Sequence, residues 1–180
     1  KGCFGIGPVS GAPLFEIHSR KILALERRYG CDIPFYVMTS RANDAATRKF
    51  FAGHRYFGLN KSNVLFFVQG MWPAMDGDGN VILDRPDRIF MSPDGHGGTL
   101  SALKDSGMLD DMTRRKVTTL FYFQVDNPLV AIADPAFIGL HVLSRSDMSV
   151  KVCGKRDPDE GLGVVVKCGG RNMLVEYTEL

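Results

Sequence analysis

The sequence predicts an α/β fold, with a mainly parallel, mixed sheet flanked by helices and followed by a β-rich extension. Short β-branched and aromatic runs alternate with segments of helical periodicity up to residue 143, and strand patterns separated by glycine turns dominate the remainder. A hydrophobic content of 44% with 23% charged residues is typical of a globular chain that buries a core. These values exclude a disordered or fibrous protein.

Local patterns define the elements of the first half. Apolar residues at helical spacing predict a helix over 14–29, and Gly30 supplies its stop. The other elements predicted here are a strand over 33–38, a helix capped at Asn43 or Asp44 and closed at Gly58, a strand over 64–68, and a hairpin turn over 76–80.

The second half begins with a short strand and a glycine-rich loop. The loop, 93–98, joins that strand to a predicted helix. The elements predicted in this half are strands over 88–91, 118–125, 149–152, 164–167 and 173–177 and helices over 99–109 and 135–143.

The most informative segment is the apolar run 118–125, which ends in Asp126, Asn127 and Pro128. Ligands of open α/β sheets gather where strands release their carboxyl ends, so Asp126 is well placed to hold a metal beside a bound phosphate. Mg²⁺ typically takes one or two carboxylates together with phosphate oxygens and waters. The alternative is that Asp126 and Asn127 only cap the turn before Pro128.

The glycines of the loop 93–98 let its backbone approach a flat or anionic ligand closely, although such a loop can also be merely a tight connection. His96 within it is expected to make hydrogen bonds rather than bind a metal, because no second histidine or cysteine stands at a useful spacing. Gln69 ends the preceding strand and can read the edge of a nucleobase. Glu176 could grip sugar hydroxyls, or could simply face solvent on its strand.

Several classes of protein are disfavoured. A net charge of +2 without a basic stripe argues against nucleic acid as a partner. Neither a dinucleotide fingerprint nor a P-loop occurs. No apolar run approaches the roughly 20 residues of a membrane span. The four cysteines lack zinc-site spacing and are expected to be reduced, mostly packed thiols of a cytoplasmic protein.

A longer succession of motifs resembles the eukaryotic-type UDP-sugar pyrophosphorylases, and most of all their UDP-N-acetylhexosamine branch. The resemblance covers nearly the whole chain in the right order. Its blocks are Lys1-Gly2, Leu14–His18, Phe35–Ser40, Phe66–Met71, Pro93–Gly98, Val125–Leu129, Ala133–Gly139, Gly163–Val165 and Val175–Glu179.

The resemblance implies a Rossmann-like (GT-A-like) nucleotidyltransferase domain that joins UTP to a sugar 1-phosphate with Mg²⁺, releasing pyrophosphate. The implied roles are charge neutralisation by Lys1 and catalysis by Lys1 and Asp126. Nucleotide contacts are implied for Gln69, Pro93, Gly95, His96 and Asp126, metal binding for Asp126, and sugar contacts for Asn127, Gly163 and Glu176.

Two departures from the family pattern qualify this expectation. The glycine-rich loop of the family should precede Lys1, and further C-terminal elements should follow, so residues 1–180 are expected to be a catalytic domain truncated at both ends and inactive alone. His96 stands where the N-acetylhexosamine branch typically has asparagine, which keeps glucose 1-phosphate as the alternative to N-acetylglucosamine 1-phosphate.

Hypotheses from other classes also stay open. One is a non-catalytic nucleotide-binding module. Another is a metal-dependent glycosyltransferase, although Asp126-Asn127-Pro128 lacks the second carboxylate of its usual D-x-D motif.

Overall fold

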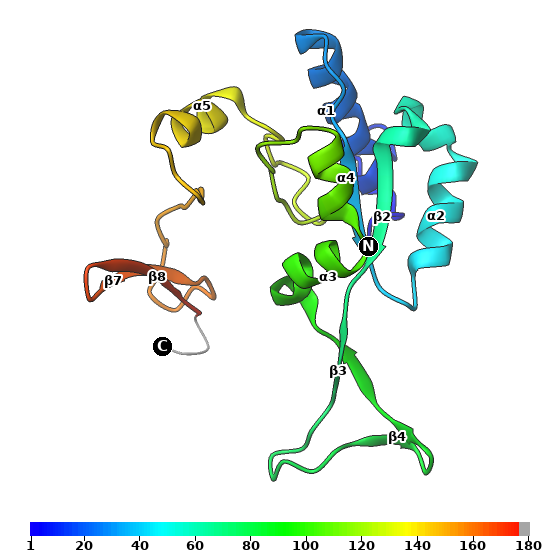
Figure 1. Cartoon of the computed structure of the whole chain (residues 1–180), viewed down its shortest axis with the longest axis vertical. Helices are drawn as coiled ribbons and strands as arrows, with labels where there is room; N and C mark the ends of the chain where they lie inside the picture. Colours follow the sequence, from blue (N-terminus) through cyan, green and yellow to red (C-terminus); the bar gives the residue numbers. More distant parts are fainter. Residues whose placement is uncertain (177–180) are drawn as a thin grey trace. The chain divides into compact units, whose positions relative to one another are not determined.

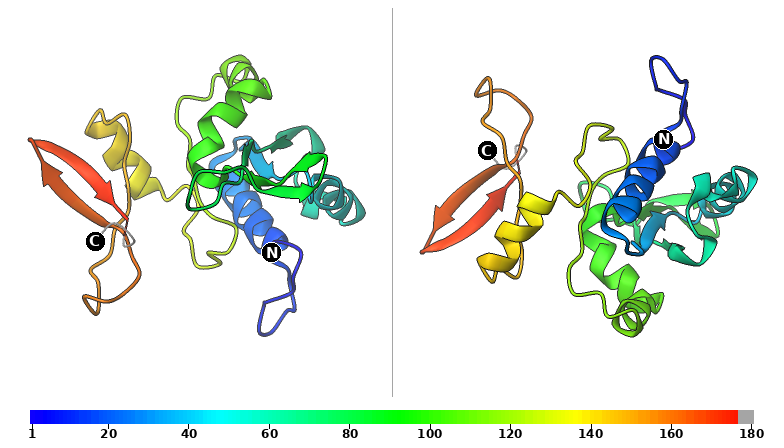
Figure 2. Two further views of the ribbon diagram at one scale, coloured as in Figure 1. Left: turned by 90° about the horizontal axis from the view of Figure 1, so that it is seen from below. Right: turned by 90° about the horizontal axis from the view of Figure 1, so that it is seen from above.

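The computed structural model describes residues 1–176 and divides into two compact units (Figures 1 and 2). The larger unit is Lys1–Asp134, and the smaller one begins at Pro135. The candidate nucleotide and metal residues belong to the larger unit, and the candidate sugar residues Gly163 and Glu176 belong to the smaller one.

Helix α1, Leu14–Tyr29, has the bounds that the sequence predicts. It ends where Gly30 takes a φ of 61°, a conformation that glycine enters without a side-chain clash, and the Gly30 N–H donates to the carbonyl of Glu26. One face of the helix is buried, and it consists of Leu14, Phe15, His18, Ser19 and Ile22.

Strands β1, Phe35–Thr39, and β2, Val64–Val68, pair in parallel with Phe35 opposite Val64. Helix α2, Asp44–Gly53, lies between them in the chain. Parallel neighbours need such a crossover, so the three elements form a βαβ unit. The strand β2 has the predicted bounds, β1 is shifted from the predicted 33–38, and α2 begins where predicted. The parallel register places the end of β2 beside the end of β1.

The expected end of the second helix at Gly58 is wrong, because α2 stops at Gly53. Arg55, Tyr56 and Phe57 have φ values of 50, 53 and 54°, and a right-handed helix cannot continue through this left-handed region. Short 3-10 segments over Arg55–Gly58 and Lys61–Asn63 lead into β2 instead.

An aromatic cluster forms the core of the larger unit. The fully buried ring of Phe51 lies 4.9 Å from the ring of Phe15 and 5.2 Å from that of Phe66, in tilted and edge-on geometry. The buried members of this core are Phe15, Ile22, Val37, Phe51, Leu59, Val64 and Ile132.

The predicted strand over 118–125 is wrong, since no strand of residues 1–176 pairs with it. Its apolar pattern marks burial instead: Phe121, Phe123 and Val125 pack against the core. A ladder needs a second backbone about 4.8 Å away, which a pattern of side chains does not supply. In the part of the chain that is described, the parallel sheet therefore consists of β1 and β2.

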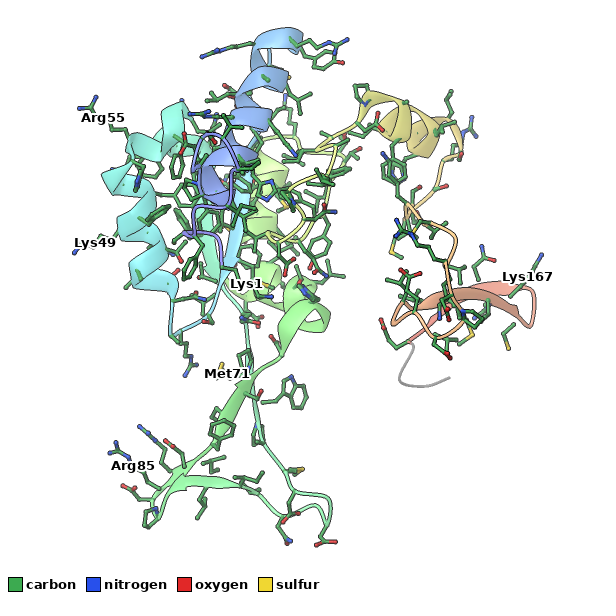
Figure 3. All side chains as sticks on the ribbon, turned by 180° about the vertical axis from the view of Figure 1, so that it is seen from behind. Lys1, Lys49, Arg55, Met71, Arg85 and Lys167 are labelled. Carbon is green, nitrogen blue, oxygen red and sulfur yellow. The ribbon has the colours of Figure 1, made fainter. Side chains whose placement is uncertain are left out.

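An antiparallel arm follows β2 (Figure 1). Met71 marks its start and Arg85 lies near its far end (Figure 3). The arm contains the strands β3, Met71–Pro73, β4, Leu83–Arg85, β5, Arg88–Ile89, and β6, Met91–Pro93, of which β3 pairs with β6 and β4 with β5.

The hairpin turn predicted over 76–80 is confirmed within this arm. An antiparallel bridge between Met75 and Val81 closes it, and the Asp76 carboxylate accepts hydrogen bonds from the backbone N–H groups of Asp78 and Asn80. The single strand expected over 88–91 is instead divided between β5 and β6.

Two short helices replace the single helix expected over 99–109. Helix α3 is Thr99–Asp105 and helix α4 is Met108–Arg114, separated where Gly107 takes a φ of 73°. Leu109 thus belongs to the second helix. A second apolar cluster packs these helices against β2, and its buried members are Phe67, Ala102, Leu103 and Met112.

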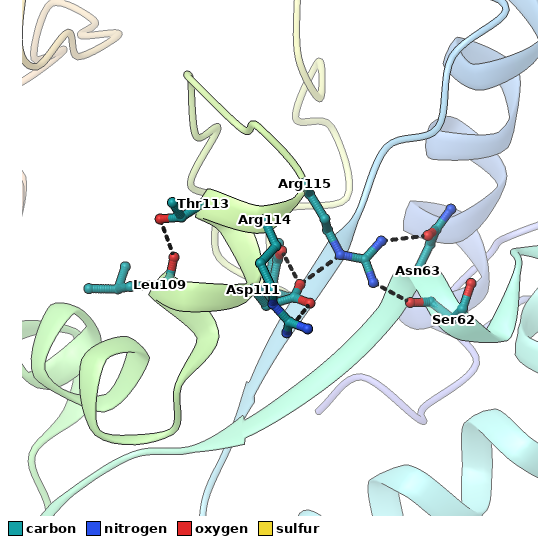
Figure 4. A network of polar contacts seen from close by, with 8 residues as sticks. Ser62, Asn63, Leu109, Asp111, Thr113, Arg114 and Arg115 are labelled. Atoms are coloured by element: carbon teal, nitrogen blue, oxygen red, sulfur yellow. Dashed lines mark hydrogen bonds and ion pairs between the residues drawn. The ribbon is translucent and has the colours of Figure 1, made fainter.

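A polar network anchors α4 to the strands (Figure 4). The Asp111 carboxylate accepts hydrogen bonds from Arg115 at 2.7 Å and from the Tyr36 hydroxyl at 2.8 Å. Arg115 also donates to Asn63 Oδ1 and to the carbonyl of Ser62. Burial, reinforced by the Asp111 carboxylate, raises the pKa of Tyr36 to about 12, so its hydroxyl stays a donor at neutral pH.

The smaller unit contains helix α5, Pro135–Leu143, and an antiparallel hairpin of β7, Val164–Cys168, and β8, Arg171–Val175. The helix and the two strands are confirmed, with β8 beginning two residues before the prediction. Tyr177, the expected end of the last strand, lies outside the described residues. The expected strand over 149–152 is wrong: its apolar residues Val150 and Val152 are exposed and form no ladder in the described chain.

None of the helices within residues 1–176 is long and apolar enough to cross a membrane. Cys3, Cys31, Cys153 and Cys168 are free thiols, and all four are exposed, which corrects the expectation that most of them are packed.

Truncating the central core ring tests the packing. We expect Phe51→Ala to lower the free energy of unfolding by about 3–5 kcal/mol, because it leaves a cavity where a fully buried ring contacts other rings. Urea denaturation followed by circular dichroism measures this. Phe4→Ala, at a ring that is 74% exposed, is the control and should stay within about 0.5 kcal/mol of the parent chain.

Acid should weaken the fold through His18. The ring is fully buried, and burial is the main reason that its pKa lies below the usual value near 6.5. The unfolded chain therefore binds a proton at a higher pH than the folded chain does. Stability is fully present above about pH 6.5 and falls as the pH drops towards the folded pKa, by at most about 1.4 kcal/mol per pH unit.

Denaturation series between pH 7 and 5.5 measure this dependence. His18→Gln keeps an N–H donor but does not titrate, so its unfolding free energy should change less across the same range. Equal slopes for the two chains would contradict the assignment to His18.

Candidate functional site

Gln69 and Gly95, both expected at the nucleobase, are in direct contact. Gln69 follows β2, and its N–H donates to the carbonyl of Thr39 at the end of β1. Its side-chain Oε1 accepts a hydrogen bond of 3.1 Å from the Gly95 N–H. Gly95 begins a short 3-10 turn with a φ of 63°, a backbone conformation that side chains disfavour. The carboxyl end of the parallel pair and the glycine-rich loop thus form one continuous edge.

Asp94 shapes this loop, which the sequence reasoning missed. A Cβ on Gly70 would lie 2.4 Å from Asp94 Oδ2, and one on Gly98 would lie 1.9 Å from the same atom. The two glycines thus leave the space that the Asp94 carboxylate occupies. Pro93, which is exposed and lies opposite Met71 at the end of β6, leads the chain into the loop. The spacing of acid and glycines in the loop is the signal that could have identified this role.

A surface hollow of about 460 Å³ opens beside Gln69. Its lining includes Gln69, Gly70 and Asp94, together with the guanidinium groups of Arg41 and Arg48. Arg48 is already engaged by Asp44 and by the carbonyl of Phe66. The hollow therefore offers amide groups, backbone and positive charge around the residue expected to read a base.

Asp126 and Lys1 form an ion pair across 125 positions of sequence. Lys1 Nζ lies 2.9 Å from Asp126 Oδ2, and the two side chains are 76% and 44% exposed. The Lys1 hydrogen bond is the main cause that holds the pKa of Asp126 below its usual range, and the charge of His96 acts in the same direction. The carboxylate is therefore ionised and open to solvent at neutral pH.

Asn127 caps the turn that carries Asp126. Its side-chain Oδ1 accepts a hydrogen bond from the Leu129 N–H, and its backbone N–H donates to the carbonyl of Gln124. Asn127 therefore caps the turn, whereas Asp126 directs its carboxylate at Lys1. Both residues follow a segment that belongs to no strand of the described chain.

His96 is near this turn and has a partner that the sequence reasoning missed. Its Nδ1 lies 2.5 Å from the Tyr122 hydroxyl, and the two rings meet edge to face. Tyr122 belongs to the segment that leads to Asp126. Tyr122 thus joins His96, the neighbour of Gly95, to the segment that leads to Asp126.

The two candidate sugar residues of the smaller unit are neighbours. A Cβ built on Gly163 would lie 3.5 Å from Glu176 Oε2 and 3.3 Å from the carbonyl of Val175, so glycine leaves the side chain of Glu176 room beside the hairpin.

Mg²⁺ is the metal that the resemblance implies. Within residues 1–176, no group of three or more His, Cys, Asp or Glu side chains is arranged to hold a metal ion. This part of the chain therefore offers no metal site made of protein side chains alone. Asp126 fits the other kind of site, in which one carboxylate shares the ion with substrate phosphates and waters.

Helix α1 holds the turn around Asp126, a feature that the sequence patterns did not indicate. His18 Nε2 lies 2.9 Å from the carbonyl of Val125, and Lys21 Nζ donates to the carbonyls of Pro128 and Val130. These contacts join residues more than a hundred positions apart, and no periodicity within α1 distinguishes them from ordinary packing.

The sequence is similar to a known family and to several known proteins. A family model described as UTP–glucose-1-phosphate uridylyltransferase matches residues 2–180. The whole chain is 41% identical to the human UDP-N-acetylhexosamine pyrophosphorylase-like protein 1 and 40% identical to UDP-N-acetylglucosamine diphosphorylase 1 of Arabidopsis thaliana. It covers 37% and 38% of these relatives, and so spans less than half of their length.

The fold has a solved counterpart. The crystal structure of the uridine diphosphate N-acetylglucosamine pyrophosphorylase from Trypanosoma brucei superposes on the whole chain with a TM-score of 0.90 and 34% identity, and the match covers 38% of that protein. This confirms the α/β nucleotidyltransferase fold class. With residues 2–180 matched, the chain belongs to the UTP–glucose-1-phosphate uridylyltransferase family.

Proposed function

We propose that residues 1–180 are part of the catalytic domain of a uridylyltransferase. The enzyme would form UDP-N-acetylglucosamine and pyrophosphate from UTP and N-acetylglucosamine 1-phosphate. The observation that carries the proposal is the meeting of a base-reading edge, Gln69 with Gly95, and a charged pair, Lys1 with Asp126, through the adjacent His96. Membership of the family supports the same reaction class.

The uracil of UTP would lie against Gln69 and Gly95. The side-chain amide of Gln69 offers N–H donors, and its Oε1 has a second lone pair to accept, which suits the edge of a pyrimidine. The hydrogen bond from the Gly95 N–H already orients this amide, so part of the ordering cost of the edge is met before the nucleotide binds.

The triphosphate would lie at Lys1 and Asp126. The Lys1 ammonium, now bound to Asp126 and largely exposed, can turn to a phosphate oxygen without leaving the carboxylate in a dry interior. Asp126 would share Mg²⁺ with the phosphates. The bound ion supplies positive charge that offsets the charge developing on the phosphate oxygens.

The reaction needs no nucleophilic side chain. An oxygen of the sugar phosphate attacks the α-phosphorus of UTP, and the bond from that phosphorus to the bridging oxygen of pyrophosphate breaks. At neutral pH the sugar phosphate is already largely deprotonated, so general-base help is dispensable. The protein contributes by holding two anions in line and by neutralising their charge. The ammonium group of Lys1 would neutralise phosphate charge directly.

The resemblance implies a sugar contact by Asn127 in the larger unit, and sugar contacts by Gly163 and Glu176 in the smaller one. Glucose 1-phosphate is the second candidate substrate, and His96 is the observation that favours it. The names of the similar human and Arabidopsis proteins refer to N-acetylhexosamine and N-acetylglucosamine and support the first candidate. A cytoplasmic location stays a prediction.

Removing the Asp126 charge tests the metal site. In the full-length protein, we expect Mg²⁺ to strengthen UTP binding. Asp126→Asn should reduce the gain in UTP affinity that Mg²⁺ produces by at least about tenfold, because an amide cannot replace an anionic ligand of a hard cation. Isothermal titration with and without Mg²⁺ measures both. Asp32→Asn, at an exposed aspartate of the same unit, is the control and should behave as the parent protein. Full metal-dependent binding by Asp126→Asn would refute the assignment.

The choice of sugar is a separate test. Pyrophosphate release by the full-length protein should give kcat/KM at least about tenfold higher for N-acetylglucosamine 1-phosphate than for glucose 1-phosphate, a ratio that contacts with one substituent can supply. The reverse preference would select the glucose alternative. The 180-residue chain alone should release little pyrophosphate.

A further inference from the structure

We propose that Lys21 and His18 are positioning residues: from helix α1 they hold the backbone of the turn 125–130 so that Asp126 presents its carboxylate to Mg²⁺ and UTP. This inference rests on the function proposed above. Neither side chain is expected to touch substrate. Their role is to fix the place of a group that does.

The turn needs such support because the segment before it is not held by a sheet. No strand of the described chain pairs with 118–125. The Asp126 side chain is 44% exposed, and its Lys1 partner is more exposed still, so this ion pair restrains the turn weakly. The position of the carboxylate therefore depends on how the surrounding segment is held, by packing of Val125 and Val130 against the core and by hydrogen bonds to its backbone.

Helix α1 supplies those contacts on both flanks of Asp126. His18 Nε2 donates to the carbonyl of Val125, the residue just before it, at 2.9 Å. Lys21 Nζ donates to the carbonyls of Pro128 and Val130, the latter at 2.9 Å. His18 and Lys21 are three positions apart and so lie on the same face of the helix.

Both donors are set in place by the fold. His18 is fully buried and packs edge-on against the ring of Phe123, 5.0 Å between centroids, which fixes its ring orientation. Its proton must be on Nε2, because a carbonyl oxygen only accepts. Lys21 is half-buried, and a charged donor to two carbonyls is stronger than a neutral one. Residues that orient a metal-binding group through such bonds typically affect metal affinity by about 10–100-fold.

Lys21→Met is the main test, since methionine keeps most of the aliphatic stem but loses the donors. In the full-length protein we expect the Mg²⁺ concentration for half-maximal UTP binding to rise at least about tenfold. The KM for the sugar 1-phosphate should change less than twofold. Lys21→Arg restores a charged donor and should recover most of the Mg²⁺ affinity. Without metal, hydrogen exchange at the backbone amides of 125–130 should accelerate in Lys21→Met.

Ile22→Val is the matched control, because it removes a buried methyl group from the next position of the same helix and leaves the donors of His18 and Lys21 in place. It should lower thermal stability while leaving the Mg²⁺ dependence unchanged. His18→Gln, which keeps a donor, should resemble the parent protein, whereas His18→Leu should resemble Lys21→Met.

An unaltered Mg²⁺ dependence in Lys21→Met, with the parent protein binding UTP in a Mg²⁺-dependent way, would overturn this inference alone. Absence of Mg²⁺-dependent UTP binding in the parent protein would refute the proposed function, and this inference with it.

Discussion

Burial of one face of helix α1 is the constraint on which the larger unit depends. Phe15 and Ile22 from that face enter the aromatic core, where Phe15 contacts the fully buried ring of Phe51. His18 leaves the same face towards the turn that carries Asp126. A single helix face therefore joins the packing that stabilises the fold to the loop that carries the candidate metal ligand. Displacing α1 would disturb both.

The other half of the site depends on how β1 and β2 end. Because the two strands are parallel and in register, Thr39 and Gln69 leave the sheet together, and their backbones remain hydrogen-bonded. Gln69 then meets Gly95 across the base of the arm. The edge that carries Gln69 and Gly95 thus depends on the sheet. The place of the Asp126 carboxylate depends instead on α1 and on a segment that belongs to no strand of the described chain. The two parts meet at His96 and Tyr122.

Sequence patterns predicted the elements whose causes are local. The helix α1 could be bounded because its apolar spacing and Gly30 lie within one short stretch, and the hairpin turn could be recognised from Asp76 and its neighbours. The prediction of a strand over 118–125 was wrong because an apolar pattern indicates burial, whereas a strand also needs a second backbone to pair with. The break between α3 and α4 at Gly107 was not predicted, because a glycine inside a helical pattern is compatible with either continuation or termination of the helix.

The residues of the candidate site also divide into those that the sequence identified and those that depend on contacts between distant positions. Gln69 and Asp126 were named from the ends of apolar segments, and Lys1 and Gly95 from the family resemblance. The structure joins Gln69 to Gly95 and Lys1 to Asp126. Asp94, Tyr122, His18 and Lys21 were missed because their roles come from contacts between distant positions.

A crystal structure of the full-length protein with UTP and Mn²⁺ in place of Mg²⁺ would test the metal assignment most directly, since the anomalous signal of manganese locates the ion. We expect a carboxylate oxygen of Asp126 within about 2.3 Å of the ion, the phosphates of UTP on its other side, and the uracil against Gln69 and Gly95. Nucleotide and metal bound away from Asp126, with that carboxylate still paired to Lys1, would contradict it.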